Sequence, residues 1–495
     1  MPRFFFLSEC AAMATPGADH PGRRWFLPIL LGATAAFKLL LAWVYAGFLS
    51  GDDLEIVETA ARYATGLAYQ PWTIRSMLHP LLAWPGMELG VFAGLASPHW
   101  LTFLACLPTV LLSTLSIALL YRLALALSWS ETEARAAAFL FAFHWLPLTY
   151  GATPYPRPIS TCLLLGAFLL VAASGSSPRH ALAAGVLAAA AMAVRWSEGL
   201  MLLPLLGFAA WRGRDLRRPR FLLGGFVAGT LIFVGLLDAW TWGRPFASLI
   251  AFLRTSGPTH FWGSQPRAWS WYGTMVLQWA GPLFLLLAAA AWRDCRVLAP
   301  LAIAVSAVVL FSLSPLKQLR YMQVAIPFLA MAAALGWGHL REGTAWRRGL
   351  ATAAFVLAIP LGLERTFATL RSKSAPALAA AGALAHIDPT PRRIVLEQMW
   401  AYGERLYLGD AVEIRDLLPR TPLPAETVAA SLPGAEAIGL YAEDVDGAVA
   451  RTLADAGFRP CAIFERARGR PVILYLPASV ACPAPGNVTS GPPRS

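Results

Sequence analysis

Residues 26–50 read FLPILLGATAAFKLLLAWVYAGFLS, and the chain continues as GDDLE. A helix rises about 1.5 Å per residue, so a run of about 20 apolar residues crosses the hydrocarbon core of a bilayer. Two arginines precede this run, which is too long for the core of a signal peptide and ends without a clean cleavage site. We therefore expect an uncleaved first span, with residues 1–24 in the cytoplasm and the acidic pair Asp52 and Asp53 directly outside.

The whole chain has the composition of a membrane protein. Of its 495 residues, 57% are hydrophobic and 14% are charged, whereas soluble domains average about 45–50% apolar and 25% charged residues. The mean hydropathy is +0.55, and 19 Trp and 26 Phe are more than a soluble surface accommodates. This composition excludes a collagen, a disordered chain and a disulfide scaffold, and it favours a polytopic membrane protein.

Apolar runs recur almost without interruption up to residue 363. A span needs about 17–25 mostly apolar residues, and on this basis we predict about eleven spans. They lie near residues 26–50, 100–127, 134–150, 159–173, 181–195, 200–211, 221–239, 273–292, 298–313, 322–339 and 349–363. The predicted fold class is an all-α polytopic membrane domain over residues 25–363.

The arginines sort the loops by membrane side. Loops after the even-numbered spans are short and mostly Arg-rich, as in residues 212–220 and 341–348, and such loops stay in the cytoplasm. The odd-numbered spans precede loops rich in aromatic residues, Gly and Pro, of which the long ones are 51–99 and 240–272. The net charge of +12 is therefore an orientation signal and does not indicate a nucleic acid partner. We expect a multi-pass protein of the inner (cytoplasmic) membrane with its C-terminus outside.

Residues 364–482 have the composition of a small soluble α/β domain, which the loop pattern places outside the cytoplasm. RIVLE at 393–397 and AIGLY at 437–441 have the pattern of buried strands. Residues 445–456 have helical spacing and end at Gly457, as helices often do. The domain sequence contains no GxGxxG or P-loop motif, so nothing in it indicates a nucleotide site.

The last part of this segment predicts a hairpin and leaves a disulfide open. Residues 461–465 and 472–476 flank a short turn. Cys461 and Cys482 pair only if they lie close together in an oxidising compartment, and the sequence decides neither point. The Pro- and Gly-rich tail 483–495 is expected to be disordered.

The acidic pair after the first span is a candidate for general base catalysis. Adjacent carboxylates raise one another's pKa, and one near neutrality takes a proton from an attacking hydroxyl group. The alternative is that Asp52 or Asp53 caps a helix over residues 54–64. Capping by one aspartate leaves the other available for catalysis, so both interpretations stay open.

The same loop carries a second polar pair. Arg75 and His79 are four residues apart, one helical turn, so both side chains are positioned to bind one anion. Anchoring at the membrane interface is the alternative, and it suits Trp72 and Trp84 better than it suits Arg75.

Other outside loops add further candidates. Arg157, Lys317 and Arg320 carry positive charge on the outside face and are suited to a phosphate group. Arg195 and Glu198 lie one turn apart, and their pairing with one another is the simpler interpretation. Aromatic residues such as Trp262 suit either sugar stacking or an interfacial belt.

The pattern of these loops resembles the GT-C glycosyltransferases, and within them the lipid-linked-sugar-dependent mannosyltransferases of glycosyltransferase family 22. That family has an acidic pair after its first span, then a Gly, and then Ile-Arg-Ser followed by Pro. Here the pair is Asp52-Asp53, the glycine is Gly66, and Ile74-Arg75-Ser76 precedes Pro80. Residues 68–71 read AYQP, where the family has Thr-Trp-Glu-Trp.

Two later stretches resemble the same family. Around the large second loop, the chain has Asp238-Ala-Trp-Thr-Trp242-Gly243, and later a Tyr272 that closes an aromatic segment. Before the tenth span the family has His-Lys-Glu-x-Arg-Phe, and this chain has Lys317 and Arg320 at the same three-residue separation. The His and the Glu of that motif are absent.

The resemblance implies an inverting transfer of a hexose, expected to be mannose, from a polyprenyl-phosphate sugar to a lipid-linked or surface glycan acceptor. Asp52 is the expected base, with Asp53 in reserve. Arg75, Lys317, Arg320 and Arg157 are expected to bind the donor phosphate. The expected substrate contacts come from His79, Asp238, Trp262, Tyr272, Arg195 and Glu198. The expected partners are membrane lipid, the polyprenyl-phosphate sugar and a glycan or glycolipid acceptor, with no metal and no other cofactor.

Two alternatives remain at this point. Other GT-C families transfer sugars to lipid A or to protein, and the acceptor distinguishes them from family 22. A transporter or flippase is the alternative from another class, and it predicts charges near the bilayer midplane and internal repeats. The polar groups of this chain gather instead in the outside loops.

Overall fold

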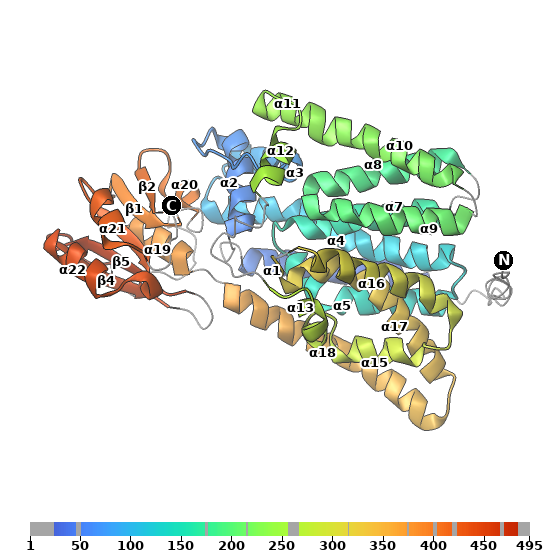
Figure 1. The fold of residues 1–495 in the computed structure, drawn as a ribbon. Helices are drawn as coiled ribbons and strands as arrows, with labels where there is room; N and C mark the ends of the chain where they lie inside the picture. Colours follow the sequence, from blue (N-terminus) through green and yellow to red (C-terminus); the bar gives the residue numbers. More distant parts are fainter. Residues whose placement is uncertain are drawn as a thin grey trace.

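The computed structural model describes residues 24–45, 51–173, 177–213, 216–255, 267–314, 316–373, 376–398, 403–417, 423–465 and 470–483. Within these ranges, the side chains of residues 51, 52, 371–373 and 404 are not described. Figure 1 shows a long bundle of helices with a small sheet-containing domain at one end.

The bundle comprises α1 (Phe26–Val44), α2 (Gly51–Thr65), α3 (Leu78–Phe92), α4 (Pro98–Ala126), α5 (Glu131–Phe143), α6 (Trp145–Tyr150), α7 (Pro156–Ala173), α8 (Pro178–Val194), η3 (Trp196–Met201), α9 (Leu202–Gly213), α10 (Arg217–Thr230), η4 (Leu231–Leu236), α11 (Leu237–Trp242), α12 (Ala247–Thr255), α13 (Trp271–Thr274), α14 (Val276–Trp279), α15 (Pro282–Ala290), η5 (Cys295–Val297), α16 (Leu298–Ser312), η6 (Leu319–Val324), α17 (Ile326–Arg341) and α18 (Ala345–Lys373).

The predicted all-α membrane fold is confirmed, and every predicted apolar run is largely helical. Six helices of the described part are long and apolar enough to cross a bilayer: Phe26–Val44, Pro98–Ala126, Pro156–Ala173, Arg217–Trp242, Cys295–Ser312 and Ala345–Leu370. Other predicted runs are interrupted. The third run divides into α5 and α6 at His144, and the eighth divides into α13, α14 and α15.

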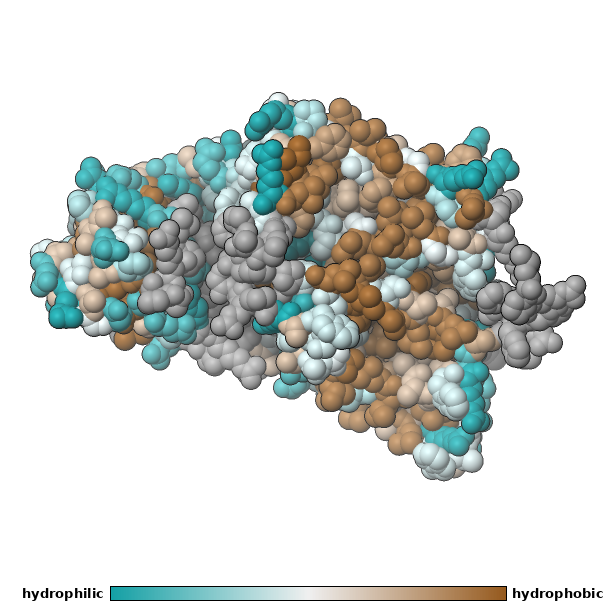
Figure 2. Space-filling view, in the orientation of Figure 1, coloured by the Kyte–Doolittle hydropathy of each residue, from teal (hydrophilic) through white to brown (hydrophobic). Residues whose placement is uncertain are grey.

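The surface of the bundle suits a lipid environment. Large apolar side chains such as Leu111, Val227 and Leu357 are exposed on its outer helices. Figure 2 shows apolar residues across the bundle face, with hydrophilic residues at the far end of the bundle and on the sheet-containing domain. In water such a surface would be unfavourable, whereas in a bilayer lipid covers it.

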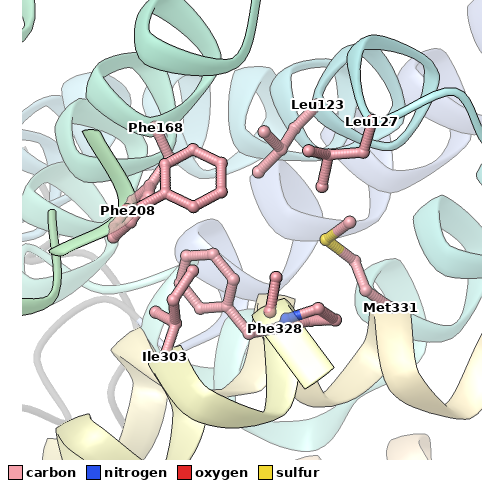
Figure 3. Close-up of a pocket in the computed structure, with 9 residues that line it drawn as sticks. Leu123, Leu127, Phe168, Phe208, Ile303, Phe328 and Met331 are labelled. Carbon is pink, nitrogen blue, oxygen red and sulfur yellow. The ribbon is translucent and has the colours of Figure 1, made fainter. Parts of the chain in front are cut away.

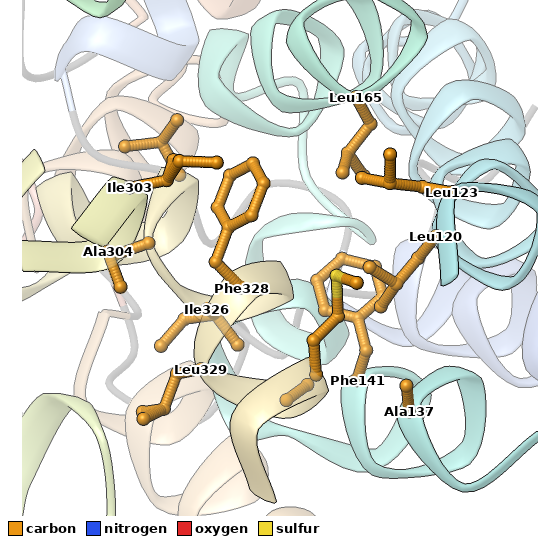
Figure 4. Packing of buried hydrophobic residues seen from close by; sticks show 14 of the residues in the cluster. Leu120, Leu123, Ala137, Phe141, Leu165, Ile303, Ala304, Ile326, Phe328 and Leu329 are labelled. Carbon is orange, nitrogen blue, oxygen red and sulfur yellow. The ribbon is translucent and has the colours of Figure 1, made fainter. Parts of the chain in front are cut away.

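The core of the bundle forms around α17. Residues from Ile326 to Gly336 are all buried, and Figure 4 shows the ring of Phe328 between Ile303 of α16 and Leu165 of α7. Small residues let neighbouring backbones approach: a Cβ atom added at Gly336 would lie 1.7 Å from the carbonyl oxygen of Leu287 on α15. Close approach of this kind is typical of helix packing in membranes.

The C-terminal domain comprises α19 (Pro376–Leu384), β1 (Arg393–Glu397), α20 (Glu404–Leu408), β2 (Glu413–Leu417), α21 (Ala425–Ser431), β3 (Ala437–Tyr441), η8 (Ala442–Asp444), α22 (Gly447–Asp455), β4 (Phe458–Phe464) and β5 (Val472–Pro477). The strand order is β2-β1-β3-β5-β4. β1 runs parallel to β2 and β3, whereas β5 runs antiparallel to β3 and β4.

The strand predictions for this domain are confirmed. RIVLE and AIGLY form β1 and β3 with the predicted bounds, and β4 and β5 form the predicted hairpin. Cys461 and Cys482, whose pairing the sequence left open, form a disulfide with Cα atoms 5.2 Å apart. The helix predicted over residues 445–456 is α22, which ends before Gly457 at φ +84°.

A buried acidic pair lies at the carboxyl ends of the two parallel strands β1 and β3. Glu397 accepts a hydrogen bond of 2.9 Å from the backbone N–H of Tyr441 and shares a hydrogen bond with Asp444. Arg470 donates to Asp444 and lies 4.0 Å from the ring centroid of Tyr441. Burial, followed by the contact with Asp444, raises the pKa of Glu397 from 4.5 to about 8. At neutral pH this carboxyl group therefore keeps its proton in the folded domain.

The domain should consequently lose stability as the pH rises. In the unfolded chain Glu397 ionises near pH 4.5, so its contribution to stability is complete below that pH and is lost as the pH rises through about 8. We expect the loss of stability to be on the order of 3 kcal/mol. In Glu397→Gln, whose side chain cannot ionise, most of this pH-dependent loss should be absent. Hydrogen exchange of β1 and β3 amides between pH 5 and 9 measures this dependence. Glu413→Gln, which changes an exposed ion pair, should keep the wild-type dependence of stability on pH. A Glu397→Gln variant with the wild-type pH dependence would contradict the assignment.

Candidate active site

The acidic pair lies inside a helix. α2 begins at Gly51, so Asp52 and Asp53 belong to its first turn and the predicted helix start at residue 54 is wrong by three residues. The side chain of Asp52 lies outside the described residues. Asp53 is 1% exposed, and its carboxylate interacts electrostatically with Tyr150 and Cys106.

Glu55 folds the following loop back onto α2. One of its carboxylate oxygens accepts a hydrogen bond of 3.1 Å from the backbone N–H of Trp72, and the other accepts one of 2.7 Å from Nε of Arg75. The indole N–H of Trp196 donates to the carbonyl of Ile74 at 2.9 Å. The predicted phosphate ligand Arg75 is thereby placed between the acidic helix and η3.

Arg157 and Glu198 form a buried ion pair. Nη1 of Arg157 lies 2.5 Å from Oε1 of Glu198, and both side chains are 1% exposed. The interpretation that Glu198 pairs with Arg195 is therefore wrong. Glu198 pairs with Arg157, which is 41 positions away in the sequence, and not with Arg195, which is one turn away. Arg195 instead lies 5.8 Å from the ring centroid of Tyr321, and Arg157 stacks on the same ring at 3.9 Å.

Tyr150 connects the acidic helix with Arg320. Its hydroxyl group interacts electrostatically with both Asp53 and Arg320. The guanidinium of Arg320 lies 4.6 Å from the ring centroid of Tyr155, and the rings of Tyr150 and Tyr155 are 4.9 Å apart. Arg320 also donates a hydrogen bond to the side chain of Gln318. Two candidates that are far apart in the sequence, Asp53 and Arg320, therefore both lie within electrostatic reach of Tyr150.

Lys317 is held by backbone carbonyl groups. Its Nζ donates to the carbonyl of Arg267 at 3.0 Å and to that of Ser314 at 2.5 Å. The guanidinium of Arg267 donates back to the carbonyl of Lys317 at 2.8 Å. Tyr272 fixes the next residue, because its hydroxyl accepts a hydrogen bond of 3.3 Å from the backbone N–H of Gln318.

The remaining predicted substrate residues differ in their surroundings. His79 is buried, and neither ring nitrogen has a hydrogen-bond partner among the described residues. Burial lowers the pKa of His79 to about 3, so the ring is neutral and does not add a positive charge beside Arg75. Asp238 accepts hydrogen bonds from the backbone and side chain of Ser248, which join α11 to α12. Trp262 lies outside the described residues.

The tyrosines are what sequence reasoning missed. Tyr150 and Tyr321 lie beside charged groups. Tyr150 belongs to no recognised motif, and Tyr321 stands at the Phe position of the His-Lys-Glu-x-Arg-Phe motif, which did not indicate a contact with Arg157. A sequence signal did exist for Tyr155, which stands in the segment PYPRP with Arg157. Seen in Figure 1, α2, which carries the acidic pair, lies at the end of the bundle nearer the C-terminal domain.

A small apolar cavity lies deeper in the bundle, away from these groups. Figure 3 shows the apolar side chains that line it. The lining residues are Leu123, Leu127, Phe168, Phe208, Ala299, Pro300, Ile303, Phe328 and Met331. Because the lining carries no ionisable side chain, this cavity supplies no acid, base or phosphate ligand.

The fold is that of the GT-C glycosyltransferases. A superposition on the structure of ArnT from Cupriavidus metallidurans bound to undecaprenyl phosphate gives a TM-score of 0.63 at 16% identity, covering 92% of this chain and 99% of ArnT. The sequence pattern of the Alg9-like mannosyltransferase family matches residues 33–398, and the chain belongs to that family. It is therefore a membrane glycosyltransferase of a mannosyltransferase family, which confirms the resemblance seen in the sequence.

Two further solved structures share the fold. Arabinofuranosyltransferase AftD from Mycobacteria matches with a TM-score of 0.51 at 18% identity, covering 94% of this chain and 40% of AftD. The archaeal oligosaccharyltransferase AglB from Archaeoglobus fulgidus, in complex with an inhibitory peptide and a dolichol-phosphate, gives 0.50 at 10% identity, covering 85% and 70%. No curated protein sequence matches the chain.

Proposed function

We propose that this enzyme transfers mannose from a polyprenyl-phosphate donor to a lipid-linked or surface glycan on the outer face of the inner membrane. The observation that carries the proposal is that Arg320 lies against the ring of Tyr155, which packs on Tyr150, while Tyr150 is also in electrostatic reach of Asp53 in the first turn of α2. An acidic group beside a basic group is what glycosyl transfer from a lipid phosphate requires. The bound undecaprenyl phosphate of ArnT, a protein of the same fold, supports a polyprenyl-phosphate donor.

In the proposed reaction Asp52 is the general base, with Asp53 as the reserve candidate. The carboxylate takes the proton of the acceptor hydroxyl as its oxygen attacks the anomeric carbon, and the bond from that carbon to the phosphate oxygen breaks on the opposite face. The configuration at the anomeric carbon is therefore inverted.

The leaving group is a polyprenyl phosphate, whose negative charge grows as the glycosidic bond breaks. Arg320, Lys317 and Arg75 are the proposed donors to its oxygens, since fixed positive charges stabilise such a transition state. Arg157 is buried with Glu198 as its carboxylate partner, whereas Arg75, which pairs with Glu55, is 27% exposed. The contribution of Arg157 is therefore smaller and works through its contact with Tyr321. The scheme requires neither a metal ion nor a nucleotide.

We place the reaction on the outer side of the membrane. The C-terminal domain, which lies at the same end of the bundle as the candidate residues, carries the disulfide between Cys461 and Cys482. Disulfides persist in oxidising compartments and are rare in the cytosol. The N-terminus then lies in the cytoplasm, in agreement with the positions of the arginine-rich loops.

The test is a transfer assay with the purified full-length chain in lipid vesicles. Labelled polyprenyl-phosphate mannose, glucose and aminoarabinose are offered in turn with a crude glycolipid fraction as the acceptor. The proposal expects label in the glycolipid product with the mannose donor alone, and inverted anomeric configuration in the product. Transfer from the aminoarabinose donor only, or label that crosses the vesicle membrane unreacted, would contradict it.

A further inference from the structure

We propose that the C-terminal domain is a positioning element for the acidic helix α2, and that Glu58 is the residue through which it acts. The inference rests on the proposed function, because it takes the first turn of α2 as the source of the catalytic base. It assigns a role in catalysis to a domain that carries none of the candidate catalytic residues.

Glu58 joins the two parts of the chain. It lies on α2, six residues after Asp52, and is fully buried. Its Oε1 accepts hydrogen bonds from the backbone N–H groups of Arg405 at 3.0 Å and Leu406 at 3.1 Å, in the first turn of α20. The first N–H groups of a helix have no acceptor within the helix, and a carboxylate binds them through strong, charge-assisted hydrogen bonds. A side chain of the membrane domain thus caps a helix of the C-terminal domain.

Apolar contacts surround this cap. A single core cluster combines Leu54, Val57, Ala60 and Ala61 of α2 with Leu378 of α19, and Leu406 and Tyr407 of α20 pack against it. Gly403, just before α20, has φ +57°, and a Cβ atom there would lie 3.1 Å from Cδ2 of Leu54. A Cβ atom at position 403 would therefore press on the end of the Leu54 side chain, which would have to shift.

Other contacts also hold α2 in place. Glu55, one turn before Glu58 on the same helix, binds the loop that carries Arg75. The N–H of Ala68, earlier in that loop, donates to Asp410 of the C-terminal domain at 2.9 Å. These bonds clamp α2 to the loop and to the C-terminal domain. Six residues of helix separate Glu58 from Asp52, about 9 Å along the axis, so a small rotation of α2 at the clamp displaces the first turn. A displacement of about 1 Å at a reacting group lowers a rate by up to about 100-fold.

The test compares four single variants of the full-length enzyme. Glu58→Ala removes the cap, and Gly403→Ala presses on Leu54 from the other domain without changing any charge. Gly409→Ala is the matched control, because Gly409 ends the same helix at φ +72° but has no atom within 4 Å of its added Cβ. We expect kcat to fall about 10- to 100-fold in the first two variants, with KM for the polyprenyl-phosphate donor changed less than about twofold. Glu58→Gln, which keeps an acceptor oxygen, should restore most of kcat.

Hydrogen exchange reads the docking independently of activity. In Glu58→Ala the amides of Arg405 and Leu406 should lose protection, while those of β1 and β3 keep theirs. Full kcat in a variant with exposed α20 amides would overturn the inference, and so would unchanged protection of these amides. A wild-type chain that transfers no sugar would contradict the proposed function, whereas an active wild type with an equally active Glu58→Ala variant contradicts this inference alone.

Discussion

Asp52→Asn is expected to lower kcat for mannosyl transfer by about 10²- to 10⁴-fold, the usual contribution of a general base. Asparagine keeps the size of the side chain and its ability to accept a hydrogen bond, but it takes up no proton. The acceptor hydroxyl would then have to attack without losing its proton. The measurement is the initial rate of glycolipid labelling at saturating donor, with the protein in vesicles.

The companion variant decides which aspartate acts. Asp53 is buried and interacts electrostatically with Tyr150. Asp53→Asn should therefore lower kcat less than Asp52→Asn does. A larger loss in Asp53→Asn would move the role of base to Asp53, and full activity in both variants would contradict the proposed mechanism. Glu88→Gln is the matched control: Glu88 is an exposed carboxylate on the neighbouring helix α3, and its change should leave kcat unaltered.

Glu198→Ala is expected to destabilise the enzyme by about 3–5 kcal/mol, because it leaves the charge of Arg157 buried without a counter-ion. Both side chains of this pair are 1% exposed, so water cannot reach the guanidinium to compensate. Thermal unfolding of the detergent-solubilised protein, followed by tryptophan fluorescence, measures the effect as a lower Tm. Glu131→Gln, at the more exposed ion pair with Arg135, should change stability by less than about 1 kcal/mol.

A double variant separates the stability of this pair from its chemistry. Replacing Arg157 and Glu198 together by Met removes both charges at similar volume, and such replacements are often neutral or stabilising. We expect Tm to return to near the wild-type value while transfer stays low, because Arg157 also stacks on Tyr321 in the basic part of the site. If the double variant unfolds as readily as Glu198→Ala, the unpaired charge of Arg157 is not the cause of the lower stability.

The sequence was most informative where a pattern is local. Strand β1 has four buried residues in five and strand β3 is buried throughout, so their apolar letters alone predicted them. β2, with the sequence EIRDL, is mostly only partly buried, and its mixed pattern was not recognised. The broken helices were also missed, because the chain remains apolar across the break at His144.

The site residues show why a single sequence stops short. The spacing of Arg195 and Glu198 favours a pair one turn apart, yet Arg157, brought in by α7, takes the carboxylate. Likewise, nothing near Glu58 in the sequence indicates that it caps a helix nearly 350 positions later. Contacts of this kind depend on how distant elements pack, and local spacing carries no information about them.

The packing of α17 also bears on how a polar site is accommodated in a membrane without making it leak. Directly beyond η6, which carries Arg320, eleven consecutive residues from Ile326 to Gly336 are buried, and most of them are small or apolar. Ions and protons cross a bilayer protein through chains of water and polar groups. The tightly packed α17 offers no such chain below the site, so we expect the enzyme to do its chemistry at one surface while it preserves the ion gradients of the cell.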